Sequence, residues 1–135
     1  MWDTVNDIPR FMDSEKLIDF FSDKVSAASL ASAISTEVES FRLARSKKNS
    51  SSPIYVGRED IQYSVTKGDI KNLCDSYLDG ELNEWHLEYL CNVIELSDAF
   101  SVEDDELVDT IFLLSTPEIN YPITPALVSD ISKKL

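Results

Sequence analysis

The sequence predicts an all-α or mostly α fold: one compact bundle of five to six helices in a single domain of residues 1–135. Apolar residues recur at helical spacing along most of the chain. Only three Gly and five Pro are present, fewer than a fold built on many tight turns requires. A hydrophobic content of 43% in 135 residues is enough to bury one core.

Two helices are expected in the first third of the chain. Asp13 or Ser14 is placed to cap the first helix, whose apolar residues lie between positions 17 and 21. The second is expected to follow with little break from about Ala27 to Arg45, because its apolar residues keep a 3.6-residue period. Residues 46–53 are rich in Ser and Lys and are expected to form an exposed loop.

The pattern near residues 54–65 fits two different structures. Apolar residues alternate at both ends of this segment and Gly57 lies between them, which indicates a short β-hairpin. A short helical turn is the alternative. This segment is therefore the one place where the sequence allows strands in a helical protein.

Two helices with clear start signals follow. Thr66 and Asp69 have the spacing of a capping box, and Gly80 is placed to end the helix that they begin. Asn83 is expected to cap the next helix, which is apolar nearly all round between residues 85 and 96. A helix of that character is expected at the centre of the core.

Two further helices are expected near the C-terminus. Ser101 is expected to cap the first, with residues 103–106 in its first turn and Pro117 as its stop. Thr124 followed by Pro125 is typical of the start of another helix. Behind its first turn, the first of these helices carries the apolar residues Leu107, Val108, Ile111, Phe112 and Leu114.

The chain is strongly acidic, and its acidic residues are unevenly distributed. The formal net charge is −13, and residues 72–132 hold fourteen of the 25 acidic residues but no Lys or Arg. A chain of this charge is a poor ligand for nucleic acid or for an anionic membrane, because both require basic residues. A basic macromolecule is the better expectation for a partner, since one sign of charge steers the opposite sign toward it.

The clearest group of carboxylates lies on the expected central helix. Glu84, Glu88 and Glu95 fall on one narrow polar stripe that also contains Asn92. One interpretation of this charge is a solvent-exposed face that keeps the protein soluble. The carboxylates at 103–106 are also explained by the dipole at a helix N-terminus. The carboxylates that we expect to contact a partner are Glu84, Glu88, Glu95, Asp98, Glu103, Asp104, Asp105 and Asp109.

Signals for an enzyme are weak. His86 is the one histidine, and no glycine-rich phosphate loop or calcium-loop spacing is present. Cys74 and Cys91 fall inside apolar helical patterns and are expected to be reduced thiols of the core. The sequence predicts no catalytic residue, no cofactor and no metal ligand.

Residues 1–7 lack the basic start of a signal peptide, so the cytoplasm is the expected location.

Residues 66–127 contain four runs that together are typical of one family, at residues 77–82, 85–90, 111–115 and 117–124. On these runs the segment resembles the immunity proteins that bacteria encode beside contact-dependent growth inhibition toxins. It implies a cytoplasmic antidote that binds one cognate toxin domain and covers its active site or substrate surface. Such toxins are very often nucleases, whose basic clefts a cluster of carboxylates can occupy in place of phosphates.

The sequence therefore favours a toxin-binding immunity protein, expected to act as a monomer in a 1:1 complex. Tyr121 is the best aromatic contact, because it lies in a Pro-bounded segment where core packing does not obviously need it. An acidic adaptor or secretion-chaperone-like protein is the alternative. An enzyme that uses clustered carboxylates and a divalent metal is the third hypothesis.

Overall fold

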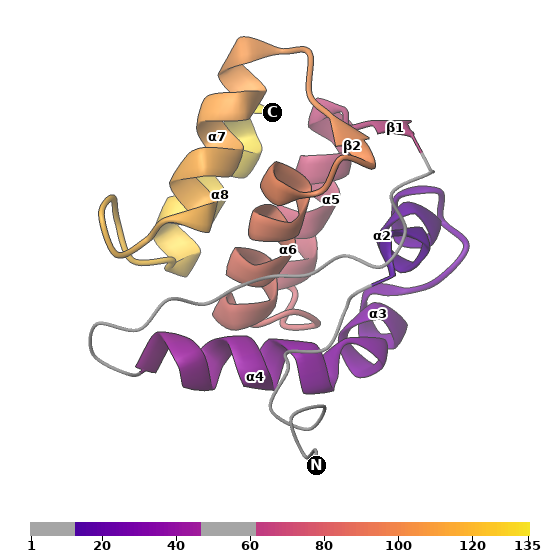
Figure 1. Ribbon diagram of the computed structural model, residues 1–135. Coiled ribbons are helices and arrows are strands. Elements are labelled where there is room, and N and C mark those ends of the chain that lie inside the picture. The colour runs from indigo at the N-terminus through magenta and orange to yellow at the C-terminus, as the bar shows by residue number, and fades with distance from the viewer. Residues whose placement is uncertain (1–12, 47–61) are drawn as a thin grey trace.

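The computed structural model describes residues 13–46 and 62–135, and helices dominate both segments (Figure 1). Two strands of two residues each, β1 (Tyr63–Ser64) and β2 (Phe100–Ser101), are the described exceptions. The seven described helices are α2 (Ser14–Phe21), α3 (Ala27–Ala33), α4 (Ser35–Ser46), α5 (Lys67–Leu78), α6 (Glu84–Leu96), α7 (Asp105–Ser115) and α8 (Pro125–Lys134). The mostly α prediction is confirmed, with one or two more helices than expected.

Helix α6 lies at the centre of the bundle, with α4 across one end of it and α7 along one side (Figure 1). Helix α8 packs on α5, and a polar cluster holds these two helices together. The Lys71 ammonium donates to the Ser132 hydroxyl at 2.9 Å, and that hydroxyl donates to Asp75 at 2.7 Å. Helix α6 is thus the central helix of the bundle, and the other helices are arranged around it.

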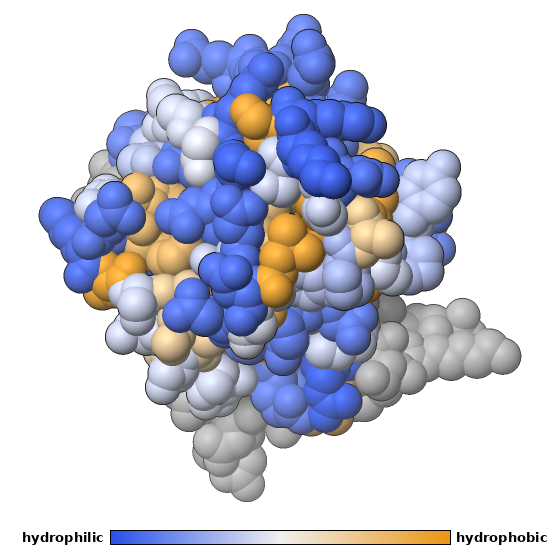
Figure 2. All heavy atoms as spheres, turned by 180° about the vertical axis from the view of Figure 1, so that it is seen from behind, coloured by the Kyte–Doolittle hydropathy of each residue, from blue (hydrophilic) through white to orange (hydrophobic). Residues whose placement is uncertain are grey.

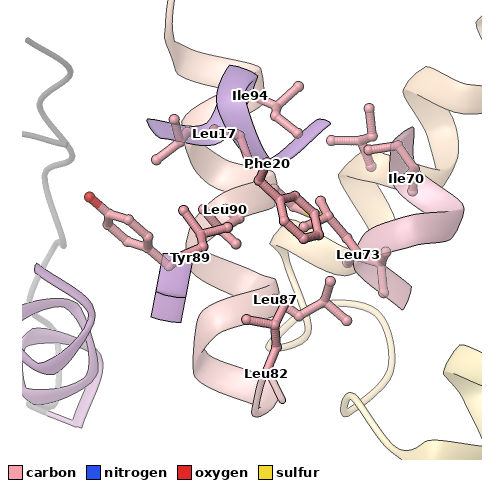
Figure 3. Close-up of a cluster of buried hydrophobic side chains, with 14 of the residues drawn as sticks. Leu17, Phe20, Ile70, Leu73, Leu82, Leu87, Tyr89, Leu90 and Ile94 are labelled. Atoms are coloured by element: carbon pink, nitrogen blue, oxygen red, sulfur yellow. The ribbon is translucent and has the colours of Figure 1, made fainter. Parts of the chain in front are cut away.

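The hydrophobic core surrounds α6. Leu87, Leu90, Cys91 and Val93 are fully buried. Side chains from α2, α5 and α6 converge in the cluster of Figure 3, with the Tyr89 hydroxyl at its edge. An apolar helix needs cover on every side, so the sequence pattern of α6 dictates its central place.

The two cysteines belong to this core, as expected. Both are free and buried. Burial raises the pKa of Cys74 to about 12 and raises that of Cys91 as well, because the thiolate form is disfavoured away from water. Both side chains therefore remain protonated, unreactive packing groups at neutral pH.

The expected helix over residues 27–45 is divided in two. Ile34, with φ −108° and ψ +12°, leaves the helical conformation between α3 and α4. The hydrogen bonds from Ile34 N to Leu30 O and from Val38 N to Ile34 O continue across the break. The two helices therefore follow each other directly, but they are separate elements.

Strand β1 pairs with β2 in parallel, with Tyr63 opposite Phe100 and Ser64 opposite Ser101. The first strand and the turn of the expected hairpin fall within residues 54–60, which lie outside the described residues. The described pairing is not a hairpin, because its two strands come from distant parts of the sequence. Ser101 is consequently part of a strand and not a helix cap, which corrects that prediction.

The caps predicted at Asp13, Thr66, Asn83 and Thr124 are all present. Gly80 has φ +87°, as its place after α5 requires. The cap of α7 is Asp104, whose carboxylate accepts from Glu106 N at 2.9 Å and Leu107 N at 3.2 Å. Local sequence thus fixes where most of these helices begin.

The cap of α6 includes His86. The Asn83 side chain accepts from the backbone N–H groups of Trp85 and His86, both at 2.9 Å. The His86 Nδ1 atom in turn accepts from Asn83 N at 3.0 Å. The single histidine therefore has a structural role, in which its ring must be neutral to act as an acceptor.

None of the described helices has both the length and the apolar character that crossing a bilayer demands.

We predict that Asn83→Ala lowers the free energy of unfolding by about 1 kcal/mol, because two N–H groups at the start of α6 lose their acceptor. Urea denaturation followed by circular dichroism measures this change. Asn72→Ala is the matched control, since no hydrogen bond of the Asn72 side chain is found in the described part of the chain. Equal losses in the two variants would contradict the capping role.

A second prediction concerns pH. Burial lowers the pKa of His86 below its ordinary value of 6.5, so the unfolded chain takes up a proton at a higher pH than the folded chain does. Neutral His86 contributes its full stabilisation to the folded protein above pH 6.5. This contribution is lost as the pH falls through the folded-state pKa of His86. We expect His86→Gln, which keeps an acceptor, to reduce the loss of stability between pH 7.5 and pH 5.5. Parallel curves for the two proteins would contradict this role.

Candidate functional site

Hydrogen bonds join α6 to α7 along the polar stripe of α6. The Asn92 side-chain amide donates to the backbone oxygen of Ser115 at 3.0 Å and to that of Glu88 at 2.9 Å. The Ser115 hydroxyl donates to the Glu95 carboxylate and lies 3.0 Å from the Phe112 oxygen. The stripe therefore forms the seam between two helices.

This seam corrects one of the predicted partner contacts. Glu88 is only 5% exposed and Asn92 is 9% exposed, so the expected open row of glutamates is interrupted at its middle. Glu84 and Glu95 are both exposed, but they lie eleven residues apart, about 16 Å along the helix axis. The three glutamates share a face of α6 without forming one accessible surface.

Asp104 belongs to the 103–106 group that a helix N-terminus was expected to explain, and it has a second structural role that the sequence did not indicate. Besides capping α7, its carboxylate pairs with the Lys67 ammonium at 3.4 Å. The pKa of Asp104 is held below its usual value, first by the hydrogen bond from Leu107 N and then by the charge of Lys67. This carboxylate therefore connects the starts of α5 and α7.

The outer face of α7 carries what we call the α7 ridge: Asp105, Asp109 and Phe112. At about 100° per residue these three side chains point away from Leu107 and Leu114, which are buried. All three ridge residues are exposed. Of the remaining predicted contacts, Asp98, Glu103 and Tyr121 are also exposed, as a contact requires.

Two of the apolar residues of α7 lie at the surface. Val108 is 43% exposed and Phe112 is 45% exposed, because α7 is covered on one side only. Leu96, Ile119 and Tyr121 are exposed as well. The signal for this was in the sequence: α7 has more apolar residues than one buried face can hold.

A hollow of about 310 Å³ lies beside the α7 ridge, between the end of α6, strand β2 and α7. We call it the α6–α7 groove. Its apolar lining comes from all three elements, and its one charged group is a carboxylate. The residues of the groove are Ile94, Glu95, Phe100, Val102, Val108 and Ile111.

The other hollows have different linings. One of about 290 Å³ between α7 and α8 contains Lys67 and Lys134 as well as Glu106 and Asp109, so its charges are mixed. One of about 190 Å³ beside α2 and α3 contains Lys16 and Asp19. The face opposite to that of Figure 1 is mostly hydrophilic, with apolar residues in separate small areas (Figure 2). Of these three hollows, only the α6–α7 groove has charge of a single sign.

Among residues 13–46 and 62–135, no three His, Cys, Asp or Glu side chains gather as metal ligands would. Comparison of the chain with protein-family models, with curated proteins and with solved structures finds no match.

We predict that Glu88→Lys destabilises the protein far more than Glu84→Lys. The first change replaces a buried carboxylate by a longer ammonium of opposite charge and should cost about 3 kcal/mol or more. The second changes an exposed charge at a helix start and should cost about 1 kcal/mol or less. Thermal denaturation of the two variants measures the difference. Similar melting temperatures would show that Glu88 is accessible after all.

Proposed function

We propose that this protein is an immunity protein, which binds a cognate toxin domain in the cytoplasm and blocks the active site or the substrate surface of that domain. The toxin in this proposal is a basic protein, and a nuclease is the class of toxin that fits this charge best. The observation that carries the proposal is the α7 ridge, an exposed acidic face next to an apolar groove, within sixty-one residues that contain no Lys or Arg.

The negative charge of the α7 ridge favours a basic partner. Glu95, Glu103, Asp105 and Asp109 are exposed carboxylates on or near the end of α6 and the start of α7. A nuclease holds its substrate with Lys and Arg, so carboxylates on a rigid helix can occupy the same basic cleft. Opposite charges would also speed the encounter, which suits an antidote that must act before the toxin does.

Apolar contacts would then hold the complex together. Phe112 lies on the ridge, and Ile119 and Tyr121 are exposed in the segment between α7 and α8. Interfaces gain most of their affinity from a few such large side chains, with charged groups around them. The acidic stretch thus offers both the attraction and the anchors that a tight 1:1 complex needs.

The resemblance to immunity proteins supports the proposal through the fold more than through the surface. Several residues that carry it, including Leu82, Leu87, Leu90, Ile111 and Leu114, are buried, and Gly80 ends a helix. Residues of this kind preserve a scaffold. The choice of partner must rest on exposed residues, and the runs that define the resemblance contain some of these as well, among them Phe112, Ile119 and Tyr121.

The acidic adaptor remains the second candidate. Secretion chaperones of similar size and charge are typically α/β dimers, so the mostly helical fold counts against that class. The carboxylate- and metal-dependent enzyme is the third hypothesis, and calorimetric titration with Mg²⁺ or Mn²⁺ tests it. Heat of binding with micromolar affinity would favour that enzyme over the immunity protein.

The decisive experiment uses the polypeptide encoded directly upstream of this chain. Its C-terminal domain is expressed in cells with and without the protein, and growth is measured. The proposal expects growth arrest that this protein relieves, together with a 1:1 complex in analytical ultracentrifugation. An upstream product that is harmless, or a toxin that this protein neither binds nor neutralises, would overturn it.

We predict that the double variant Asp105→Lys/Asp109→Lys slows association with that toxin domain at least about tenfold at low salt, because the steering charge of the α7 ridge is reversed. Stopped-flow fluorescence at several ionic strengths measures the rate. The control Glu81→Lys/Asp130→Lys makes the same change of charge at exposed residues outside α7. Equal effects of the two variants would mean that only net charge matters.

A further inference from the structure

We propose that the α6–α7 groove receives one large apolar side chain from a basic partner, within a segment whose Lys or Arg residues flank that side chain. This inference rests on the proposed function for its setting and adds the chemistry of the contact. The occupant is a protein segment, and the groove is its anchoring pocket.

The size and lining of the groove favour a side chain as its occupant. Its volume of about 310 Å³ is at the lower end of the range for small-molecule pockets, roughly 300–1,000 Å³. Five of its six lining residues are apolar, and Val108 at its edge is largely exposed. A hollow of this kind buries an aliphatic or aromatic side chain well and offers few polar groups to orient a small ligand.

The charges around the groove specify what flanks that side chain. Glu95 is part of the lining, Glu103 follows the lining residue Val102, and Asp105 lies one helical turn before Val108. All three carboxylates are exposed, and residues 72–132 supply no basic residue to offset them. Lys or Arg beside the incoming side chain would meet this rim favourably.

The groove is also held in shape before any partner arrives. The Ser115 hydroxyl fixes the Glu95 carboxylate, and Asn92 joins α6 to α7 from within. Strand pairing between Tyr63 and Phe100 holds the third wall. A preformed pocket loses little entropy on binding, which favours an anchor that inserts without rearrangement.

A second copy of this chain fits the groove poorly. Each copy carries a net charge of −13, and the rim of the groove is itself acidic. Self-association through this face would bring like charges together at an apolar contact, which is costly. The complementary occupant is therefore a cationic segment of a different protein.

Nuclear magnetic resonance titration tests the inference on the intact protein without the toxin. The probe is a capped nine-residue peptide with a central Trp between Lys and Gly residues. Two comparison peptides have the same charge, one with Ala in place of Trp and one of Lys and Gly only. We expect the Trp peptide alone to shift the methyl signals of Ile94, Val102, Val108 and Ile111 in a saturable way.

The variant Val108→Gln should weaken binding of the Trp peptide at least about fivefold, because it makes the wall of the groove polar. Val108 is exposed, so this variant should fold, and circular dichroism checks that it does. Leu78→Gln is the matched control, since Leu78 is an exposed leucine on α5 outside the groove. It should leave the affinity unchanged.

Several results would overturn the inference. Equal shifts with all three peptides would show that charge alone attracts them, and shifts confined to α2 and α3 would place the anchor elsewhere. Shifts at the groove that grow with protein concentration, without peptide, would make a second copy the occupant. These outcomes leave growth protection by the intact protein untouched. Failure of that protection with normal peptide binding would instead reject the proposed function alone.

Discussion

The burial of the middle of α6, residues 87–94, is the constraint on which the rest of the structure depends. Apolar residues lie on most sides of this helix, so neighbouring helices must cover most of its surface. Its few polar groups then have to be satisfied inside the bundle, because unpaired polar groups away from water are costly. Asn92 meets this need by donating to the backbone oxygens of Glu88 and of Ser115 at the end of α7.

This seam determines where the acidic residues become accessible. Carboxylates on α6 are divided between a buried middle and two exposed ends, whereas α7 has a whole face in solvent. Covering α6 takes up only one side of α7, although α7 is itself apolar on more than one side. Val108 and Phe112 are left at the surface for that reason, among carboxylates and beside a groove.

Apolar and acidic groups contribute differently to such a face. Charges act over distance and raise the rate of encounter, but exposed ion pairs add little affinity. Buried apolar anchors act only on contact, and they slow dissociation. A face that combines the α7 ridge with the α6–α7 groove would supply both to the complex with a basic protein that we propose.

The sequence by itself determined the helical class, the central place of α6 and most helix boundaries, because caps such as Asn83 and turns such as Gly80 act over a few residues. It also located the acidic stretch, but not the accessible part of it. The periodicity of apolar and polar residues shows which residues share a face of a helix. It does not show which of these faces packs against a neighbouring helix. Only the tertiary structure decided that Glu88 is buried, that Phe112 is exposed and that Tyr63 pairs with Phe100, since each depends on contacts between distant segments.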